Sequence, residues 1–409
     1  MKTKRKILND PLYGFITIPG DLIFEIIEHP YFQRLRRIRQ LGLGDLVYPG
    51  AVHSRFHHAI GAMHLMEKVL ESLRLKGHEI SDQEFESALI AILLHDIGHG
   101  PFSHVLEHAI LNKVHHEDIS LLIIKHLNII FDNKLALAIK IFEGTYDRHF
   151  FHQLVSSQLD LDRMDYLNRD SYFSGVTEGV VSNERITHMF DIVQDEIVIE
   201  EKGVFSVENF LNSRRLMYWQ VYLHKTIIAA EEMLIQIVKR AKYLCQNHVN
   251  IITTPSLQLF LQKNISFTEF DHQVLEHFTQ MDDYDLWGSI KIWQHHSDIV
   301  LSMLCKKLLN RDLFKNHLSN TEYGTLYIEM VDAKLKQHYK INDEELAFIR
   351  STGTLTNLGY ISSGNKIKVM RKNGEIIDIS EISDLPNIKA ISEIVKKYYL
   401  CCPKEGLRQ

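Results

Sequence analysis

Apolar residues recur at three- and four-residue intervals along most of the 409-residue sequence, which is the spacing that places side chains on one face of an α-helix. Only 8 prolines and 20 glycines interrupt this pattern. We predict helices over residues 21–27, 31–40, 55–75, 82–95, 117–127, 153–168, 183–192 and 207–245, with several more between residues 256 and 309. The expected fold class is therefore mainly α.

Strand signals are few and lie mostly toward the C-terminus. The segment EIVIEEKGVFSV, which begins at Glu196, predicts a short hairpin around Lys202 and Gly203. The segment KIKVMRKNGEIIDI alternates apolar and polar residues on both sides of Asn373-Gly374, a dipeptide typical of a two-residue hairpin turn. We predict a helical core over residues 1–320 and a small α+β C-terminal lobe over residues 321–409.

Composition excludes several classes of protein. The longest apolar runs are about seven residues, far short of the roughly 20 that span a bilayer, and the N-terminal MKTKRK lacks the apolar segment of a signal peptide. We therefore expect a cytoplasmic protein without membrane contacts. The four cysteines show no CxxC spacing, which argues against a disulfide framework. A net charge of −6 makes nucleic-acid binding at most a secondary property.

A buried-looking helix runs directly into a polar cluster in the sequence ALIAILLHDIGHGPFSH. Seven apolar residues, 88–94, precede His95-Asp96, a pair that offers an imidazole and a carboxylate to a divalent metal. His99 follows one helical turn later. Eleven of the 24 histidines fall between His53 and His116, where even spreading would place about four. This clustering indicates a site rather than scattered core histidines.

Two further segments carry suitable donors. The sequence HSRFHHAIGAMH supplies four histidines upstream, and LDLDRMDYLNRD supplies Asp160, Asp162, Asp165 and Asp170 downstream. One donor from each segment, together with His95-Asp96, would complete a metal site. Any one of these residues alone is more often a solvated or hydrogen-bonded side chain, so their order along the chain carries the prediction.

His58, His95-Asp96 and Asp162 match the H…HD…D signature of the HD-domain metal-dependent phosphohydrolases. Five longer segments resemble the deoxynucleoside triphosphate triphosphohydrolases of that family, including the mammalian enzyme, which carries an added SAM domain: NDPLYGFI, YFQRLRRIRQLGLGDLVYPGAVHSRFHHAIG, LLHDIGHGPFSH, HHEDIS and LDLDRMDYLNRDSYFSGV. The resemblance covers roughly residues 6 to 230, and no SAM domain is expected here. It implies an HD-domain helical core.

The resemblance implies one divalent ion per active site, held by His58, His95, Asp96 and Asp162. Mn, Fe, Ni, Co, Zn and Mg all suit this mixed donor set, and Mg can also accompany the nucleotide. His99 and His116 are expected to contact the α-phosphate. His104, with Glu107 nearby in the sequence, matches the position that protonates the 5′-oxygen of deoxyribose.

The implied substrate is a deoxynucleoside triphosphate, cleaved to deoxynucleoside and inorganic triphosphate. Arg55, Arg163 and Arg214 match phosphate-binding positions, of which the second is lysine in the mammalian enzyme. Residues expected around the sugar are Gln40, Leu41, Tyr166, Asp170 and Tyr222. Tyr166 stacked under the deoxyribose would leave no space for a 2′-hydroxyl.

A second nucleotide, an activating deoxynucleotide bound between subunits, is a further implied partner, which would make the protein a homodimer or homotetramer. The matching residues are Lys6, Ile7, Asn9, Glu28, Gln33, Arg36 and Arg185, with Glu28 standing where the mammalian enzyme has aspartate. If this site exists, ligand binding and assembly affect each other reciprocally.

Two other functions fit part of the pattern. A phosphodiesterase or nucleotidase on the same metal core would need the four metal donors but not the triphosphate-binding arginines. A non-catalytic module that binds nucleotides or single-stranded nucleic acid would use the arginines at positions 34, 36, 37 and 39 together with aromatic side chains. The joint presence of Arg55, Tyr166, Asp170 and Arg214 favours the triphosphohydrolase.

Overall fold

The computed structural model describes residues 6–103, 109–111, 114–357, 366–383 and 395–407. The first half of the chain is built from these elements: β1 (Ile7–Asp10), β2 (Gly14–Thr17), α1 (Asp21–Glu28), α2 (Pro30–Gln33), α3 (Arg55–Leu75), α4 (Asp82–Leu94), α6 (His116–Ile130), α7 (Ala136–Glu143), α8 (Phe150–Val155), α9 (Leu161–Ser174) and α10 (Asn183–Met189).

The second half continues with β3 (Phe190–Val193), β4 (Glu196–Glu200), α11 (Val204–Met217), α12 (Lys225–Gln246), α13 (Pro255–Gln262), α14 (His272–Gln280), α15 (Asp283–Trp293), α16 (Ile299–Leu309), β5 (Lys315–Ser319), α17 (Thr325–Tyr339), α18 (Asp343–Leu346), β6 (Ser351–Asn357), β7 (Lys368–Met370), β8 (Ile376–Asp378), α19 (Ile379–Ile382), β9 (Val395–Cys402) and α21 (Lys404–Leu407). The prediction of a mainly α fold is confirmed.

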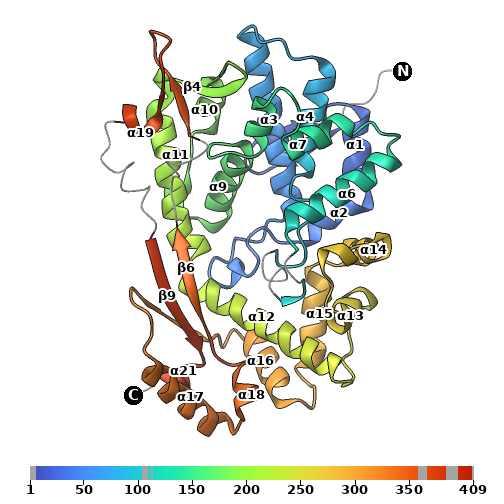
Figure 1. Ribbon diagram of the computed structural model, residues 1–409, viewed down its shortest axis with the longest axis vertical. Helices are drawn as coiled ribbons and strands as arrows, with labels where there is room; N and C mark the ends of the chain where they lie inside the picture. The colour runs from blue at the N-terminus through green and yellow to red at the C-terminus, as the bar shows by residue number, and fades with distance from the viewer. Residues whose placement is uncertain (1–5, 104–108, 112–113, 358–365, 384–394, 408–409) are drawn as a thin grey trace.

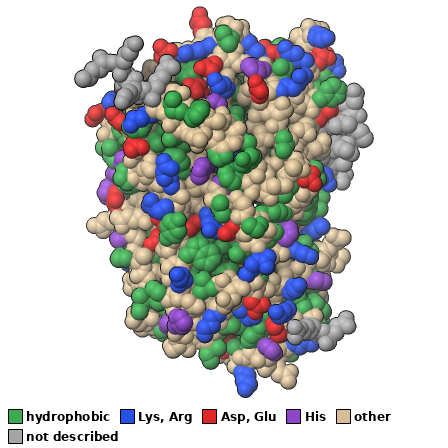
Figure 2. Space-filling view, turned by 180° about the vertical axis from the view of Figure 1, so that it is seen from behind, with side chains coloured by type: hydrophobic (Ala, Val, Ile, Leu, Met, Phe, Trp, Pro, Cys, Tyr) green, Lys and Arg blue, Asp and Glu red, His purple; other side chains and the backbone are tan. Residues whose placement is uncertain are grey.

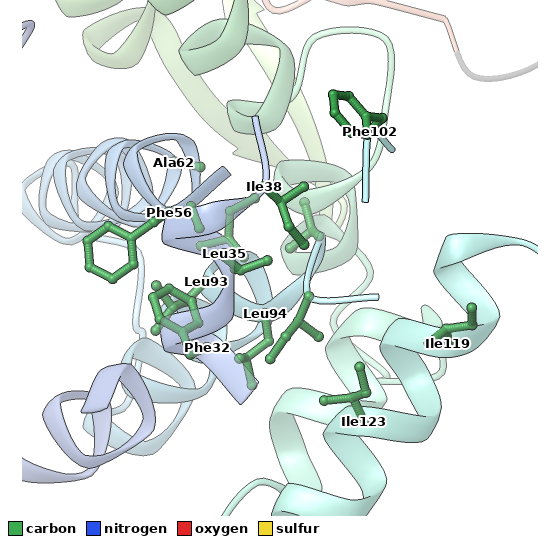
Figure 3. Close-up of a cluster of buried hydrophobic side chains, with 14 of the residues drawn as sticks. Phe32, Leu35, Ile38, Phe56, Ala62, Leu93, Leu94, Phe102, Ile119 and Ile123 are labelled. Carbon is green, nitrogen blue, oxygen red and sulfur yellow. The ribbon is translucent and has the colours of Figure 1, made fainter. Parts of the chain in front are cut away.

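Helix α3 lies at the centre of the first half and packs against both α4 and α9. The apolar run of residues 88–94 in α4 is fully buried, as its sequence predicts. Figure 3 shows how the core forms around it: Phe32 and Leu35, Phe56 of α3, Leu93 and Leu94 of α4, and Ile119 and Ile123 of α6 all belong to one cluster. Each such side chain contributes roughly 1.5–3 kcal/mol when it leaves water.

Four of the predicted helices need correction, either in their interior or at their ends. The predicted helix 153–168 is two helices, because the chain leaves α8 after Val155 and the Asp160 side chain accepts a hydrogen bond from the Arg163 amide to start α9. The predicted helix 207–245 is interrupted by a π-helical turn at Tyr218–Tyr222 before α12 begins. The predicted helix 183–192 ends at Met189, and residues 31–40 form only α2 and a 3₁₀ turn (Arg34–Arg37).

The hairpin prediction was right in one place and wrong in another. Strands β7 and β8 pair antiparallel around Gly374, whose φ of 84° lies in the left-handed region. The first hairpin instead joins β3 to β4 through Gln194 and Asp195, which have φ of 52° and 62°. The expected turn at Lys202-Gly203 lies in a 3₁₀ helix, because β4 has already ended at Glu200.

The C-terminal strands do not stay together in one sheet. Strand β7 pairs parallel with β4, which extends the first hairpin into a sheet of order β3-β4-β7-β8. Strands β5, β9 and β6 form a separate antiparallel sheet, and β5 and β9 pack on α12. Figure 1 shows α12 running between the upper helical part and the lower helices, with β6 and β9 beside its N-terminal end. The domain boundary at residue 320 stays a prediction.

The surface is mixed in character. Figure 2 shows one face on which basic, acidic and apolar side chains are interspersed. Among the described residues, no helix combines the length and the apolar character needed to cross a bilayer.

Replacing Glu84 with glutamine is expected to destabilise the fold in a pH-dependent way. Burial opposes ionisation, but hydrogen bonds from Ser81, Arg148 and Tyr146 outweigh it and lower the pKa of Glu84 to about 2. The carboxylate therefore stabilises the fold above its unfolded pKa of about 4.3, and this stabilisation is lost as the pH falls toward 2. Urea unfolding should show a loss of about 1–3 kcal/mol at pH 7 and a smaller one at pH 3.

The exposed Glu79 supplies the control, since Glu79→Gln removes the same charge without these hydrogen bonds and should leave stability within about 0.5 kcal/mol. An equal destabilisation by Glu84→Gln at both pH values would contradict this assignment.

Candidate active site

Two histidines have their ring orientation fixed by buried partners. His58 lies in the first turn of α3 with no exposed surface, and its Nδ1 lies 2.8 Å from Asp165 Oδ2. His95 caps the end of α4, and its Nδ1 lies 2.6 Å from the carbonyl oxygen of Ile92. Because a carboxylate and a carbonyl can only accept, each Nδ1 donates a hydrogen. Both Nε2 atoms are then free to coordinate a metal ion.

These Nε2 atoms converge on Asp162, which α9 presents in its first turn. Asp162 Oδ1 lies 3.1 Å from His58 Nε2 and 3.4 Å from His95 Nε2, and the two nitrogens are 3.4 Å apart. Asp96 completes the group: its Oδ1 lies 3.4 Å from His95 Nε2 and its Oδ2 lies 3.7 Å from His58 Nε2. The structure therefore brings together donors from three distant segments.

These separations fit a metal-coordination polyhedron. With metal–ligand distances of about 2.0–2.2 Å, neighbouring donors of a tetrahedral or octahedral site lie about 2.9–3.6 Å apart. The three distances among His58, His95 and Asp162 fall in that range. Two imidazoles and two carboxylates suit a hard to borderline divalent cation, and they do not select one metal.

The cluster is held by a buried network of charged side chains. Asp165 accepts hydrogen bonds from Arg169 at 2.9 and 3.0 Å, and Arg169 also pairs with Asp10 of β1 at 2.8 Å. A Cβ at Gly61 would lie 2.1 Å from Asp165 Oδ1, so only glycine lets α3 approach α9 this closely. Asp165 of α9 therefore holds His58 in place, and the contact of Arg169 with Asp10 of β1 supports this arrangement.

The electrostatics of the cluster favour a positively charged occupant. Burial opposes the charged forms of all these groups, but the neighbouring imidazoles hold the pKa of Asp162 below its usual value. Asp162 and Asp165 raise the pKa of His58 to about 10 against its own burial. Because a metal ion requires the neutral imidazole, metal and protons compete for these nitrogens.

His99 and His116 lie beside the metal-binding cluster. Their rings stack with centroids 3.9 Å apart, and His99 Nε2 lies 3.3 Å from Asp96 Oδ1. Burial and the Arg55 guanidinium hold the pKa of His99 well below its usual value, so this imidazole stays neutral. A Cβ at Gly98 would lie 2.2 Å from the His116 carbonyl oxygen, which explains the glycine in the HDIGHG sequence.

A cavity of about 590 Å³ opens in front of these groups. Ten of the residues that the sequence assigned to the site line it: Gln40, Leu41, Arg55, Asp96, His99, His116, Asp162, Tyr166, Asp170 and Tyr222. His58, His95, Arg163 and Arg214 are not among the residues that line it, although the charges of both arginines act on the lining residue Tyr166. His104 and Glu107, the expected proton donor and its neighbour, lie outside the described residues.

The three predicted phosphate-binding arginines differ in their surroundings. Arg55 donates from Nε to Ser103 Oγ at 2.8 Å and pairs with Asp96. Arg163 pairs with Asp160, while its buried Nε has no hydrogen-bond partner. Arg214 is 9% exposed, and its buried Nε and Nη1 atoms have no hydrogen-bond partner in the described structure. Buried guanidinium donors left unpaired are suited to a polyanionic ligand.

The predicted sugar-binding residues form one connected wall. The Tyr222 hydroxyl donates to Asp170 Oδ2 at 2.8 Å, and Asp170 Oδ1 lies 2.7 Å from His53 Nε2. The rings of Tyr166 and Tyr222 are 6.0 Å apart and nearly perpendicular. Tyr166 thus stands between the metal-binding cluster and the rest of the cavity, as its ring also lies 6.4 Å from that of His58.

The predicted regulatory residues lie away from this cavity. Arg36 lies over the Phe56 ring at 3.6 Å and donates to Gln33 at 2.8 Å, with Glu28 close enough to influence its pKa. Lys6 lies 4.3 Å from the centre of the Phe24 ring in α1, and Ile7 and Asn9 are exposed on β1. Arg185 is separate, on α10, and donates to the Lys202 carbonyl. The regulatory role of these residues stays a prediction.

Several cavity residues were missed from the sequence. Tyr218 begins the unexpected break between α11 and α12, and Glu231 and Glu232 follow it on α12. Thr354, Leu355 and Tyr399 come from strands β6 and β9. No local sequence pattern predicts that Thr354, Leu355 and Tyr399 reach the cavity, because they lie more than 120 residues from the π-helical turn along the chain. Asp165 and Arg169, spaced i and i+4, could have been recognised as an ion pair within α9.

Comparison with known proteins agrees with this geometry. Residues 55–170 match the model of a family described as HD domain, and residues 181–248 match one described as HD associated region. A solved structure of a phosphohydrolase from Bacteroides thetaiotaomicron has 47% sequence identity and a TM-score of 0.95, covering 98% of this chain and 100% of that one. The uncharacterized protein YwfO of Bacillus subtilis is 35% identical over 93% of this chain and 88% of its own length.

A third relative carries a described activity. The deoxynucleoside triphosphate triphosphohydrolase SAMHD1 homolog of Dictyostelium discoideum is 33% identical over 56% of this chain. The match spans 48% of that protein, so the similarity concerns about half of each chain.

Replacing Asp165 with asparagine is expected to weaken metal binding although Asp165 is not itself a metal donor. The variant loses the charge that fixes the His58 tautomer, and losing such an outer partner lowers metal affinity about 10- to 100-fold. Isothermal titration with Mn²⁺ would measure this change. The exposed Asp147→Asn is the matched control, and unchanged affinity in Asp165→Asn, at a temperature where melting shows it folded, would argue against the assignment.

Proposed function

The chain belongs to the HD-domain phosphohydrolases, and on this basis we propose that it hydrolyses deoxynucleoside triphosphates to deoxynucleoside and inorganic triphosphate in a metal-dependent reaction. The observation that carries the proposal is the cavity itself. It brings donors of a cation-binding cluster and a tyrosine wall into one space large enough for a nucleotide, and guanidinium groups with unpaired buried donors lie near its Tyr166. The described activity of the Dictyostelium relative points the same way.

The metal donors would be His58, His95, Asp96 and Asp162. When bound, a divalent cation supplies Lewis-acid polarisation of a phosphoryl oxygen and lowers the pKa of a coordinated water. The outer partners Asp165 and the Ile92 carbonyl keep both imidazoles oriented toward the cation.

The side chains around the cluster would position the triphosphate. His99 stays neutral beside Asp96, with His116 stacked against it, and both imidazoles border the space proposed for the α-phosphate. Arg55 is already oriented by Ser103, and Arg214 offers two unpaired donors. Forked guanidinium donors match phosphate oxygens well. The two arginines would partly neutralise the polyanion, and all four side chains would orient it around the reacting phosphorus.

The reaction joins water to the α-phosphorus and breaks the bond from that phosphorus to the 5′-oxygen. The departing alkoxide takes up a proton, which gives the deoxynucleoside, and the water oxygen leaves with the triphosphate. His104, with Glu107 beside it in the sequence, is the proposed source of that proton, by resemblance to the family. A histidine suits this role because its pKa lies near neutrality.

Tyr166 is the proposed basis of the preference for deoxyribose. It stands at the wall next to Tyr222 and the Asp170 carboxylate, which the Tyr222 hydroxyl and His53 hold in place. A ring stacked under the sugar leaves no room for a 2′-hydroxyl, so the discrimination is steric.

The products decide between the proposed reaction and other reactions on the same fold. Incubation with each of the four dNTPs and Mn²⁺ should yield deoxynucleoside and triphosphate, and excess chelator should abolish turnover. Chromatography separates these products from pyrophosphate and deoxynucleoside monophosphates. Release of pyrophosphate or of single phosphates would instead identify a nucleotidase.

Replacing Arg214 with alanine should raise KM without changing the metal content. A hydrogen bond to a charged group contributes about 1.5–3 kcal/mol, which corresponds to about a 10- to 100-fold increase in KM. Arg215→Ala is the matched control, because the neighbouring residue points about 100° away around α11 and is less buried than Arg214. Steady-state kinetics and metal analysis on both variants would test this, and an unchanged KM in Arg214→Ala would remove the residue from the site.

A further inference from the structure

One face of helix α12 forms a wall of the cavity. Ile227, Ile228, Glu231 and Ile235 lie at the i, i+1, i+4 and i+8 positions of the helix, and all of them line the cavity. Three of these side chains are apolar and suit the faces of a planar ring. The fourth places a carboxyl group in the middle of an apolar surface.

Glu231 has no partner that would explain its position. It makes no hydrogen bond or ion pair with any residue in the described part of the chain, although it is half-buried. Its neighbour Glu232 differs, since the Tyr399 hydroxyl donates to Glu232 at 2.7 Å. Leaving a desolvated carboxyl without hydrogen bonds is costly, so this position favours an external ligand.

The surroundings of Glu231 connect it to the sugar-binding part of the cavity. A Cβ at Gly42 would lie 3.7 Å from Glu231 Oε1, so the carboxyl faces the backbone that directly follows Gln40 and Leu41. Gln40 Oε1 is a buried atom without a hydrogen-bond partner in the described part of the chain, and Gln40 lines the same cavity. Two unsatisfied polar groups therefore lie in the space next to the proposed sugar position.

We propose that Glu231 hydrogen-bonds to the nucleobase of the substrate and determines which bases the cavity accepts. This assignment rests on the proposed function, because it takes the triphosphate and sugar to lie where the metal-binding cluster and Tyr166 place them. The isoleucines of α12 would contact the ring faces of the base. Glu231 would contact its polar edge.

The protonation state of Glu231 gives the expected base preference. Burial and, to a lesser extent, the charge of Glu232 raise the pKa of Glu231 to about 8; the Tyr399 phenol is the other titratable group nearby. At neutral pH the protonated carboxyl offers one donor and one acceptor. Every base has an acceptor beside a donor on its Watson–Crick edge, so all four can pair with it.

The ionised carboxylate above that pH only accepts. Guanine alone has two adjacent donors, N1–H and the N2 amino group, that satisfy both carboxylate oxygens. As the pH rises, the cavity should therefore accept fewer bases and increasingly favour dGTP.

A competition assay measures this change. Equimolar dATP, dCTP, dGTP and dTTP with Mn²⁺ are incubated at pH 6.5 and at pH 9.5, and the relative loss of each is followed by chromatography. The ratio of losses equals the ratio of kcat/KM values, so general effects of pH on the rate cancel. For the unsubstituted protein we expect losses within about threefold at pH 6.5, and dGTP favoured about fivefold or more at pH 9.5.

Glu231→Gln is the decisive variant, because its amide has one donor and one acceptor at every pH. It should stay base-tolerant at pH 9.5, whereas Glu329→Gln on the exposed face of α17 should shift toward dGTP as the unsubstituted protein does. Base ratios that do not change with pH, or that change equally in Glu231→Gln, would overturn the assignment. Failure to release triphosphate from any dNTP would overturn the proposed function as well. That outcome differs from hydrolysis with base ratios that do not change with pH, which would overturn only the role of Glu231.

Discussion

The ion pair between Asp165 and Arg169 inside α9 supports the rest of the site. Neither side chain has exposed surface, and Asp165 also holds the Nδ1 of His58, the first residue of the metal-binding cluster. Removing one partner of a buried pair typically costs 3–5 kcal/mol, because the other charge is left uncompensated. The second contact of Arg169, to Asp10 of β1, ties the N-terminal hairpin to the same network.

Interruptions in the helices place the functional side chains. The chain leaves α8 at Val155 and restarts at Leu161 with Asp160 as cap, and this restart puts Asp162 in the first turn of α9, directly opposite His58 and His95. The π-helical turn Tyr218–Tyr222 separates Arg214 on α11 from the cavity-lining face of α12. π-Helical turns frequently occur at functional sites, and here the turn supplies Tyr222 to Asp170.

The C-terminal strands complete the cavity although they lie far from the HD region in sequence. Tyr399 of β9 fixes Glu232 on α12, and Leu355 of β6 lines the same wall. The C-terminal segment therefore takes part in the cavity through side chains that contact α12.

The sequence alone determined the fold class and the central helices, and it supplied the four residues that are proposed as metal donors. The periodicity of residues 55–75 and 82–95 is a local property, and His58, His95, Asp96 and Asp162 occur in an order that the HD family shares, so both could be read without coordinates. The tertiary structure alone decided the breaks at Asp160 and Tyr218, the pairing of β7 with β4, and the position of Glu231. The helix breaks depend on a side-chain cap and on packing. Strand pairing and the cavity walls depend on contacts between segments more than 100 residues apart, and no local sequence pattern predicts such contacts.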